Sequence, residues 1–431
     1  MAGAFTARAD DATAVYANPA GLIQLTQPEV SLDTRGWRFT NRVIDGGNQA
    51  QIGSSEGIGY SLTDDRAEAL SFVSAFYPAK SRRWVAGVFR HEPARFRSEI
   101  RSEGTILTPR LSRGFIRPVD GFYDLRIENF GVAVGVRLGK RFSLGATLGQ
   151  AHFELSSRLE RWDKLRSEAA NPNLPVDDTS GLRSPFGNAP ENIILYWAQE
   201  QEGDDDLALV FGLLWQSGRQ IEGVSVISAG AVYRQGPEFD FQAGMFGRIA
   251  GPGYISRLSP ANPPPGCQAA TGCEGVFKVP DVTGIGVSVR PGLRWLLAAD
   301  LNRVEYSDLM DQALNSLGSD QGIVGTRIQP GTFELDDGNE YRAGVEYAWF
   351  RERRLPDVFF RAGAWSDPDH KLRYVGSNDS LRQIFIPGRD QLHYTAGIGL
   401  RYRRFQLDAA VDLSAPIDTG SVAATYYFGR R

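Results

Sequence analysis

Only a few residues in this chain have types and spacings that could support catalysis. Residues 53–57 match the G-x-S-x-G pattern of serine hydrolases by letters. That pattern exposes a nucleophile only on a turn between a strand and a helix, and no such setting is predicted around Ser55. The chain has four histidines, none of which has a patterned serine and acid partner: His91, His152, His370 and His393. We therefore expect that the chain is not an enzyme.

The two cysteines of the chain are Cys267 and Cys273, and they follow a proline-rich stretch. A zinc site needs more ligands of the right type than this stretch provides. Two cysteines six positions apart, in a long loop that faces an oxidising exterior, favour a small disulfide instead. We predict a disulfide between Cys267 and Cys273, and we expect no metal and no cofactor.

The elements that must position these residues show a period of two, in which bulky apolar side chains alternate with small or polar ones. The cleanest segment has its apolar face at Leu392, Tyr394, Ala396, Ile398, Leu400 and Tyr402. Its other face carries His393 and Thr395, which we expect to be polar lining residues. About fourteen such segments follow residue 27, centred near residues 34, 72, 88, 132, 147, 211, 230, 285, 300, 345, 361, 397, 409 and 425.

The connections between these segments alternate in length. Short ones at 78–82, 139–140, 291–293 and 403–404 alternate with long ones at 41–67, 97–122, 156–205, 242–278, 307–338 and 367–390. This alternation is typical of a transmembrane β-barrel, whose closure also satisfies every backbone hydrogen bond in lipid. β-Propellers and sandwiches share the strand pattern, but the chain has no repeat of about 40 to 50 residues.

The amino-acid composition further limits the classes of protein to which the chain could belong. The 431 residues are 42% hydrophobic and 11% aromatic with a net charge of -4, which excludes a disordered chain and argues against nucleic acid as a partner. No run of about 18 apolar residues could form a membrane helix. We predict an all-β fold, a transmembrane antiparallel β-barrel of about 14 strands, whose aromatic residues face outward into lipid.

The first 27 residues do not have the strand pattern. Residues 4–22, which include Asn18, Pro19 and Ala20, resemble the N-terminal plug, or hatch, of the long-chain fatty acid transporter family of Gram-negative outer membranes. That family also contains toluene and xylene channels. Residues 279–309, 341–368 and 386–399 resemble the family's later strands in the same order. The resemblance implies a hatch at 1–27 that plugs the lumen and a barrel at 28–431. Because no signal-peptide pattern precedes the hatch, we expect the natural start to lie upstream.

The resemblance also implies a function, which is uptake of long-chain fatty acids or other hydrophobic small molecules by passive, laterally gated diffusion. In the family, loops collect the ligand and a kink in the third strand opens the barrel wall. The expected location is the cell outer membrane, where the partners are a hydrophobic ligand, membrane lipid and lipopolysaccharide, and the expected state is a monomer. A non-transporting barrel that assists assembly or secretion is the alternative, followed by a soluble β protein.

Pro93 lies within or at the end of the third predicted strand, shortly before Phe96. Proline cannot donate to a strand ladder and is confined to edges, ends and bulges. We interpret Pro93 and Phe96 as candidates for the gate, with a simple strand end as the alternative. The resemblance places the hatch turn at Asn18, Pro19 and Ala20 near that opening, although Asn before Pro forms a turn whatever its role.

Residues 159–169, within the third long loop, have helical amphipathic spacing that ends at Asn171 and Pro172. By the resemblance, this segment collects ligand and Trp162 lines its groove, whereas a capping helix over the barrel mouth is the plainer interpretation. Two acidic patches, 204–206 and 336–337, are interpreted as solvated loop charges, with divalent bridging to lipopolysaccharide as the alternative.

Overall fold

The structure is a computed structural model of residues 1–431. It describes the chain except for residues 48–57, 103–104, 107–114, 117–118, 163–193, 222–223, 244–246, 252–253, 259–266, 269–271, 310–332, 352–354, 378–381, 383–384, 386 and 429–431.

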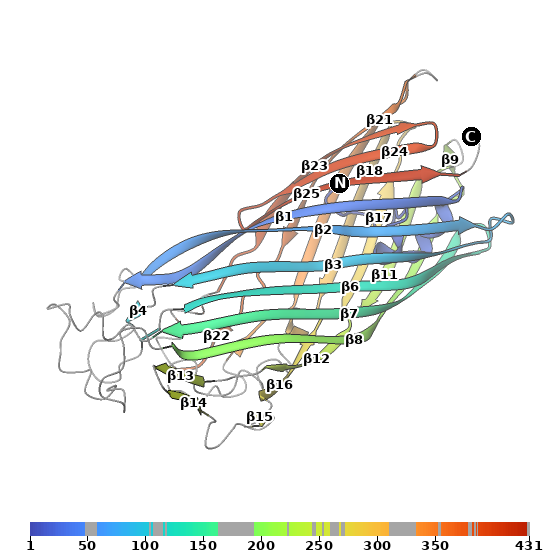
Figure 1. Ribbon diagram of the computed structural model, residues 1–431. Coiled ribbons are helices and arrows are strands. Elements are labelled where there is room, and N and C mark those ends of the chain that lie inside the picture. Colours follow the sequence, from blue (N-terminus) through green and yellow to red (C-terminus); the bar gives the residue numbers. More distant parts are fainter. Residues whose placement is uncertain are drawn as a thin grey trace.

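Fourteen antiparallel strands form a closed barrel, which Figure 1 shows from the side. In order around the wall they are β1 (Glu29–Gly47), β2 (Ile58–Pro78), β3 (Trp84–Ser102), β6 (Val119–Leu138), β7 (Phe142–Trp162), β8 (Ile194–Gln216), β11 (Ile227–Gln235), β17 (Val282–Val289), β18 (Trp295–Val304), β20 (Gly338–Trp349), β21 (Asp357–Asp367), β23 (Gln391–Tyr402), β24 (Phe405–Leu413) and β25 (Ile417–Tyr427). β25 pairs with β1 and closes the ring. The predicted barrel is confirmed, and all fourteen predicted strand centres lie inside these strands.

Shorter elements lie before and between the barrel strands. Among the described residues the helical ones are α1 (Ala14–Ala17), η1 (Pro19–Gln24) and η4 (Tyr306–Leu309). The strands are β4 (Thr105–Ile106), β5 (Phe115–Ile116), β9 (Gln220–Ile221), β10 (Val224–Ser225), β12 (Glu238–Ala243), β13 (Gly247–Gly251), β14 (Tyr254–Leu258), β15 (Cys267–Gln268), β16 (Gly272–Lys278), β19 (Phe333–Glu334) and β22 (Arg373–Tyr374). No helix among the described residues is long and apolar enough to cross a membrane.

The outer face of the barrel is an apolar band. In β6, Phe130, Val132 and Val134 are exposed, whereas Ala133 between them is buried against the lumen contents. Large aromatic side chains lie at the end of the band that carries the short turns: Trp84, Trp295, Trp349, Tyr402, Phe405 and Phe428. Tyr233, Tyr341 and Tyr394 are exposed toward the opposite edge. An apolar band flanked by aromatic girdles is what a barrel in a bilayer requires.

The first six strands are longer than the sequence predicts. They contain 19 to 23 residues each, where a membrane strand needs about ten. Beyond the band their outward side chains are charged, as in Arg38 and Asp64, which form an ion pair of 2.7 Å. The ladders therefore continue past the membrane, and much of the predicted loops 41–67, 97–122 and 156–205 is strand.

The predicted helix that starts at residue 159 is wrong over its first turn, because β7 continues to Trp162 and pairs with β8 up to Ile194. Propagation of an antiparallel ladder outweighs weak helical spacing, since each added residue completes hydrogen bonds to an existing neighbour. Residues 163–169 lie outside the described part of the chain.

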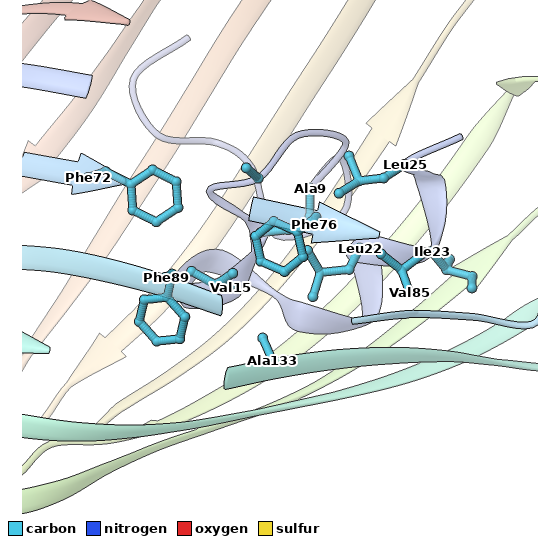
Figure 2. Packing of buried hydrophobic residues seen from close by; sticks show 12 residues of the cluster. Ala9, Val15, Leu22, Ile23, Leu25, Phe72, Phe76, Val85, Phe89 and Ala133 are labelled. Atoms are coloured by element: carbon cyan, nitrogen blue, oxygen red, sulfur yellow. The ribbon is translucent and has the colours of Figure 1, made fainter. Parts of the chain in front are cut away.

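The N-terminal segment packs inside the barrel, toward the end that carries the short turns (Figure 1). Figure 2 shows its apolar contact with the wall, where Val15, Leu22 and Ile23 of the segment meet Phe72 and Phe76 of β2. Val85, Phe89 and Ala133 complete this buried cluster from β3 and β6. This is the main apolar core of the protein, and it lies in the lumen, opposite to the lipid-facing band.

Candidate functional site

The N-terminal segment is seated on inner-wall positions that lack side chains. A Cβ at Gly145 of β7 would collide with the backbone of Pro19 and Ala20, and one at Gly212 of β8 would collide with Asn18 Oδ1. Thr147 Oγ1 donates to Val15 O at 2.7 Å, and Asn18 Nδ2 donates to Leu213 O at 3.1 Å. Small inward residues of β7 and β8 thus let the segment approach the wall closely.

Charged groups hold the other side of the segment. Asp300 Oδ2 of β18 accepts the backbone N–H groups of Phe5 and Thr6, each at 2.7 Å. Arg8 pairs with Glu346 of β20 at 2.9 Å, and Glu346 also accepts from Arg361 of β21 at 2.7 Å. Removing one partner of an ion pair this well buried strongly destabilises the folded protein, because the other charge is left buried and unpaired. The segment is therefore fixed to both sides of the barrel.

Asn18, Pro19 and Ala20 are fully buried against β6, β7 and β8. Asn18 caps η1, since its Oδ1 accepts from Ala20 N at 3.1 Å. Tyr16 of the segment stacks on His91 of the third strand, with ring centroids 4.2 Å apart. Burial raises the pKa of the Tyr16 phenol to about 12.

The wall is interrupted between β2 and β3. Their ladder runs from the pair Pro78 and Val85 to the pair Phe72 and His91, and the described residues beyond this point form no β2–β3 pairs. The flanking ladders continue, because β1 pairs with β2 as far as Ile58 and β3 pairs with β6 as far as Ser102. Two strand edges therefore face each other without backbone pairing. We call this interruption the wall break.

Both strands carry a bulge at the foot of the wall break, which is the end where the β2–β3 ladder stops; the far end is called its head. In β3 the register against β6 shifts between His91 and Ala94, around Glu92 and Pro93. In β2 the register against β1 shifts opposite Asp33 and Arg35. A bulge bends its strand and increases the local twist, and Pro93 cannot donate a backbone hydrogen bond. Pro93 thus lies inside the strand, which excludes the alternative that β3 simply ends there.

Polar contacts mark both ends of the wall break. At its foot Arg90, which points outward just above the apolar band, donates to Leu70 O across the break. At its head, Ser98 Oγ donates to Asp65 Oδ2 at 2.6 Å, and Glu99 N donates to Asp65 Oδ1 at 3.2 Å. Between these two levels the described residues of β2 and β3 form no ladder pair with each other, so the unpaired stretch is closed by a polar contact at each end.

Aromatic side chains line the inner wall at the level of the break. Phe96 of β3 packs on Phe39 of β1 with ring centroids 5.0 Å apart and on Tyr123 of β6 at 5.3 Å. A second apolar cluster continues around the lumen, with buried Ile127, Ala151, Phe153 and Phe239 at its centre. Ala94 and Leu125 pack against that cluster. The predicted candidate Phe96 therefore belongs to a continuous apolar inner surface beside the wall break.

The paired strands β12 and β16 complete this surface from inside the barrel. Phe239 of β12 and Phe277 of β16 stack on Phe153 of the wall at 5.1 and 5.5 Å. β12 is tied to β8, because Asp206 accepts from Glu238 N at 2.7 Å and Asp204 accepts from Asp240 N at 2.8 Å. The prediction that patch 204–206 consists of solvated loop charges is wrong for these two residues, since they lie on the inner face of β8.

The exposed Asp336, in the second predicted acidic patch, pairs with the half-buried Arg373, and Asp337 pairs with Arg303 at 2.9 Å. The histidines serve structural contacts rather than a triad. His393 lies on the inner face as predicted, with Nδ1 2.8 Å from Asp412 Oδ1 and its ring stacked on Trp365. Residues 53–57 lie outside the described chain, and no metal-binding group is found among the described residues.

Trp162 ends β7, and its side chain lies outside the described part of the structure. Its predicted contact with ligand stays a prediction. The signal that sequence reasoning missed is the inward aromatic set at Phe39, Tyr123, Phe153, Phe239 and Phe277. In strands that continue past the membrane band, the alternation of apolar residues switches from the outer to the inner face, and only the register reveals the switch.

Cys267 and Cys273 face each other directly as partners in the β15 and β16 ladder. Opposed residues in an antiparallel ladder have Cα atoms about 4.5 to 5.5 Å apart, within the range of a disulfide. We expect no thiol to react with maleimide before reduction and two to react after it. The Cys267→Ser variant, as a control, exposes one reactive thiol. Two reactive thiols in the unreduced protein would contradict the predicted disulfide.

No protein-family model matches the chain, and no curated protein matches it. Solved structures match over nearly its whole length. A Pseudomonas aeruginosa FadL homologue has a TM-score of 0.60 at 15% identity, covering 100% of this chain and 96% of that chain. The CymD monoaromatic hydrocarbon channel has a TM-score of 0.55 at 13% identity, with 99% and 95% covered. The Pseudomonas putida toluene transporter TodX has a TM-score of 0.53 at 14% identity, covering 97% of this chain and 94% of that chain.

The resemblance found in the sequence is thus confirmed at the level of the fold. Barrels of this architecture reside in bacterial outer membranes, which agrees with the predicted location. The chain has the fold of the FadL-like and monoaromatic hydrocarbon channels, a closed fourteen-stranded transmembrane barrel.

Proposed function

We propose that the chain is an outer-membrane channel that takes up hydrophobic small molecules, such as long-chain fatty acids or aromatic hydrocarbons, and releases them sideways through the wall. The observation that carries this proposal is the wall break between β2 and β3 beside an apolar inner surface that includes Phe96. A hydrophobic ligand gains nothing from a water-filled pore, since each exposed CH2 costs about 0.8 kcal/mol.

The N-terminal segment, residues 1–27, acts in this proposal as a hatch that separates the lumen from the periplasm, and residues 28–431 form the barrel. Its support is the seating described above, in which Arg8 and the backbone of Phe5 and Thr6 are tied to β18 and β20. With the straight route closed, a ligand on the aromatic surface leaves through the wall break. The break begins just above Val88 and Phe130, at the rim of the lipid-facing band.

Pro93 and the β3 bulge serve as the bend that keeps β3 away from β2 in this proposal. The barrel works as a monomer, surrounded by membrane lipid and lipopolysaccharide. The names of the structures with this fold, a FadL homologue, a toluene transporter and a monoaromatic hydrocarbon channel, support a hydrophobic ligand. The long charged extensions of β1 to β8 lie on the side from which ligand arrives.

A charge on the aromatic surface tests this function. In Gram-negative cells that lack their own fatty-acid channel, we expect the chain to raise the initial uptake rates of oleate and toluene several-fold. Phe96→Glu is expected to remove most of that gain, because a carboxylate replaces a ring packed between Phe39 and Tyr123. Arg97→Glu, one position along on the outer face of β3 and 57% exposed, is the matched control and should transport normally. Equal uptake by cells with and without the chain would refute the function.

A further inference from the structure

Arg90 contacts three strands at the foot of the wall break. Its guanidinium donates to Leu70 O of β2, to Glu92 Oε2 of its own strand at 2.6 Å, and to Glu128 Oε1 of β6. Leu70 lies in the β2 bulge and Glu92 in the β3 bulge. A guanidinium can satisfy three acceptors at once because its donors form a rigid planar fork. Arg90 therefore joins the two bulges where the ladder between β2 and β3 ends.

One of the acceptors of the outward-facing Arg90 is a buried carboxylate, that of Glu92. The Glu92 side chain is only 2% exposed, and its Oε1 has no hydrogen-bond partner. Arg126 and Arg95 approach it at 3.6 and 3.9 Å, so Arg90 provides its one short ion pair among the described residues. A buried carboxylate with an unsatisfied oxygen is costly, and exposing it to water relieves that penalty. Opening the wall break at this level would expose Glu92.

We propose that Arg90 is the residue that sets the width of the wall break, with Glu92 and Glu128 anchoring it to β3 and β6 while it retains β2 through the carbonyl of Leu70. The inference rests on the lateral route proposed above and adds its control point. Widening the break requires Arg90 to release Leu70 O, and it brings Glu92 into contact with water. The contact at the head of the break, between Asp65 and Ser98, lies on a separate level and does not replace Arg90.

Spin labels on the two edges measure this directly. In a Cys267→Ser/Cys273→Ser background, labels at Glu68→Cys and Arg97→Cys, both exposed on the outer faces of β2 and β3, report the width of the break. The variant Arg90→Met/Glu92→Gln removes the link without leaving a buried unpaired carboxylate. We expect its distance distribution in lipid to become broader and to shift to longer distances by several ångströms. Arg90→Lys keeps the charge but lacks the planar guanidinium. Its distances should lie between those of the parent protein and those of the double variant.

The matched control is Arg38→Met/Asp64→Asn, which removes an outward ion pair of 2.7 Å from the intact ladder of β1 and β2. It should leave the distribution as in the parent protein. A distribution unchanged by Arg90→Met/Glu92→Gln, or changed equally by the control, overturns the role of Arg90. Failure of the lateral route gives a different result. In that case Arg90→Met/Glu92→Gln still widens the break, but a covalent link across the break leaves oleate uptake unchanged. Arg90 would then retain its role, and the proposed route would be wrong.

Discussion

With cysteines at positions 65 and 98, oxidation is expected to lower oleate uptake about tenfold or more, and reduction to restore it, because a disulfide would hold β2 against β3. At the head of the wall break Ser98 Oγ donates to Asp65 Oδ2 at 2.6 Å, so these two short side chains already meet across the break. A covalent link at this point opposes any widening of the break, whereas a straight path through the lumen would be unaffected.

The matched control is a cysteine pair at Arg38 and Arg66, which are directly opposed in the continuous ladder of β1 and β2, where Cα atoms lie about 4.5 to 5.5 Å apart, within the range of a disulfide. This pair should oxidise equally well without slowing uptake, because it links strands that are already hydrogen-bonded on both sides of the site. Both pairs belong in the Cys267→Ser/Cys273→Ser background. If the oxidised 65–98 pair transports oleate as fast as its reduced form, ligand does not leave through the wall break.

The Gly145→Val variant is expected to displace the N-terminal segment. The added side chain would enter the space of the Pro19 and Ala20 backbone, which no rotamer change can vacate. Overpacking of this kind costs about 1–3 kcal/mol, comparable to several of the contacts that seat the segment. Trypsin should then cleave after Arg8, which is shielded by its ion pair with Glu346 in the native protein. Planar bilayers should show ion conductance that the parent barrel lacks.

Ala146→Val is the control for this experiment. It adds two carbons to the next residue of β7, which lies between the exposed Leu144 and Leu148 on the lipid-facing side. Protease resistance and conductance should match those of the parent protein. Should Gly145→Val resist trypsin as well as the control does, the close seating of the N-terminal segment on β7 would be disproved.

The fold was largely predictable because the lipid-facing half of a barrel strand leaves a local pattern. Apolar alternation in segments such as 392–402 depends only on which residues face lipid, so all fourteen strand centres were found without any long-range information. Strand ends were predicted poorly, because beyond the membrane nothing forces the outer face to be apolar. There β7 continues to Trp162 through residues such as Glu154 and Arg161, which by composition resemble loop residues.

The candidate site was predictable only in part, again for physical reasons. Pro93 was identifiable because a proline inside a strand disrupts its ladder whatever the surroundings. The partner bulge in β2, which contains Leu70 and presents its carbonyl to Arg90, leaves no such mark, since it depends on the register between β1 and β2. Tyr16, rather than Asn18, reaches the third strand because the helical turn α1 directs it toward His91.

By itself the sequence determined the barrel, the number of its strands and which face of each meets lipid, because these follow from local alternation and from the demand that every backbone group in a bilayer be paired. Only the tertiary structure decided where that pairing fails. The end of the β2–β3 ladder at Phe72 and His91, the aromatic surface around Phe96, and the triple contact of Arg90 all depend on the stagger between neighbouring strands. Stagger is set by closure of the whole ring, so no single segment encodes it.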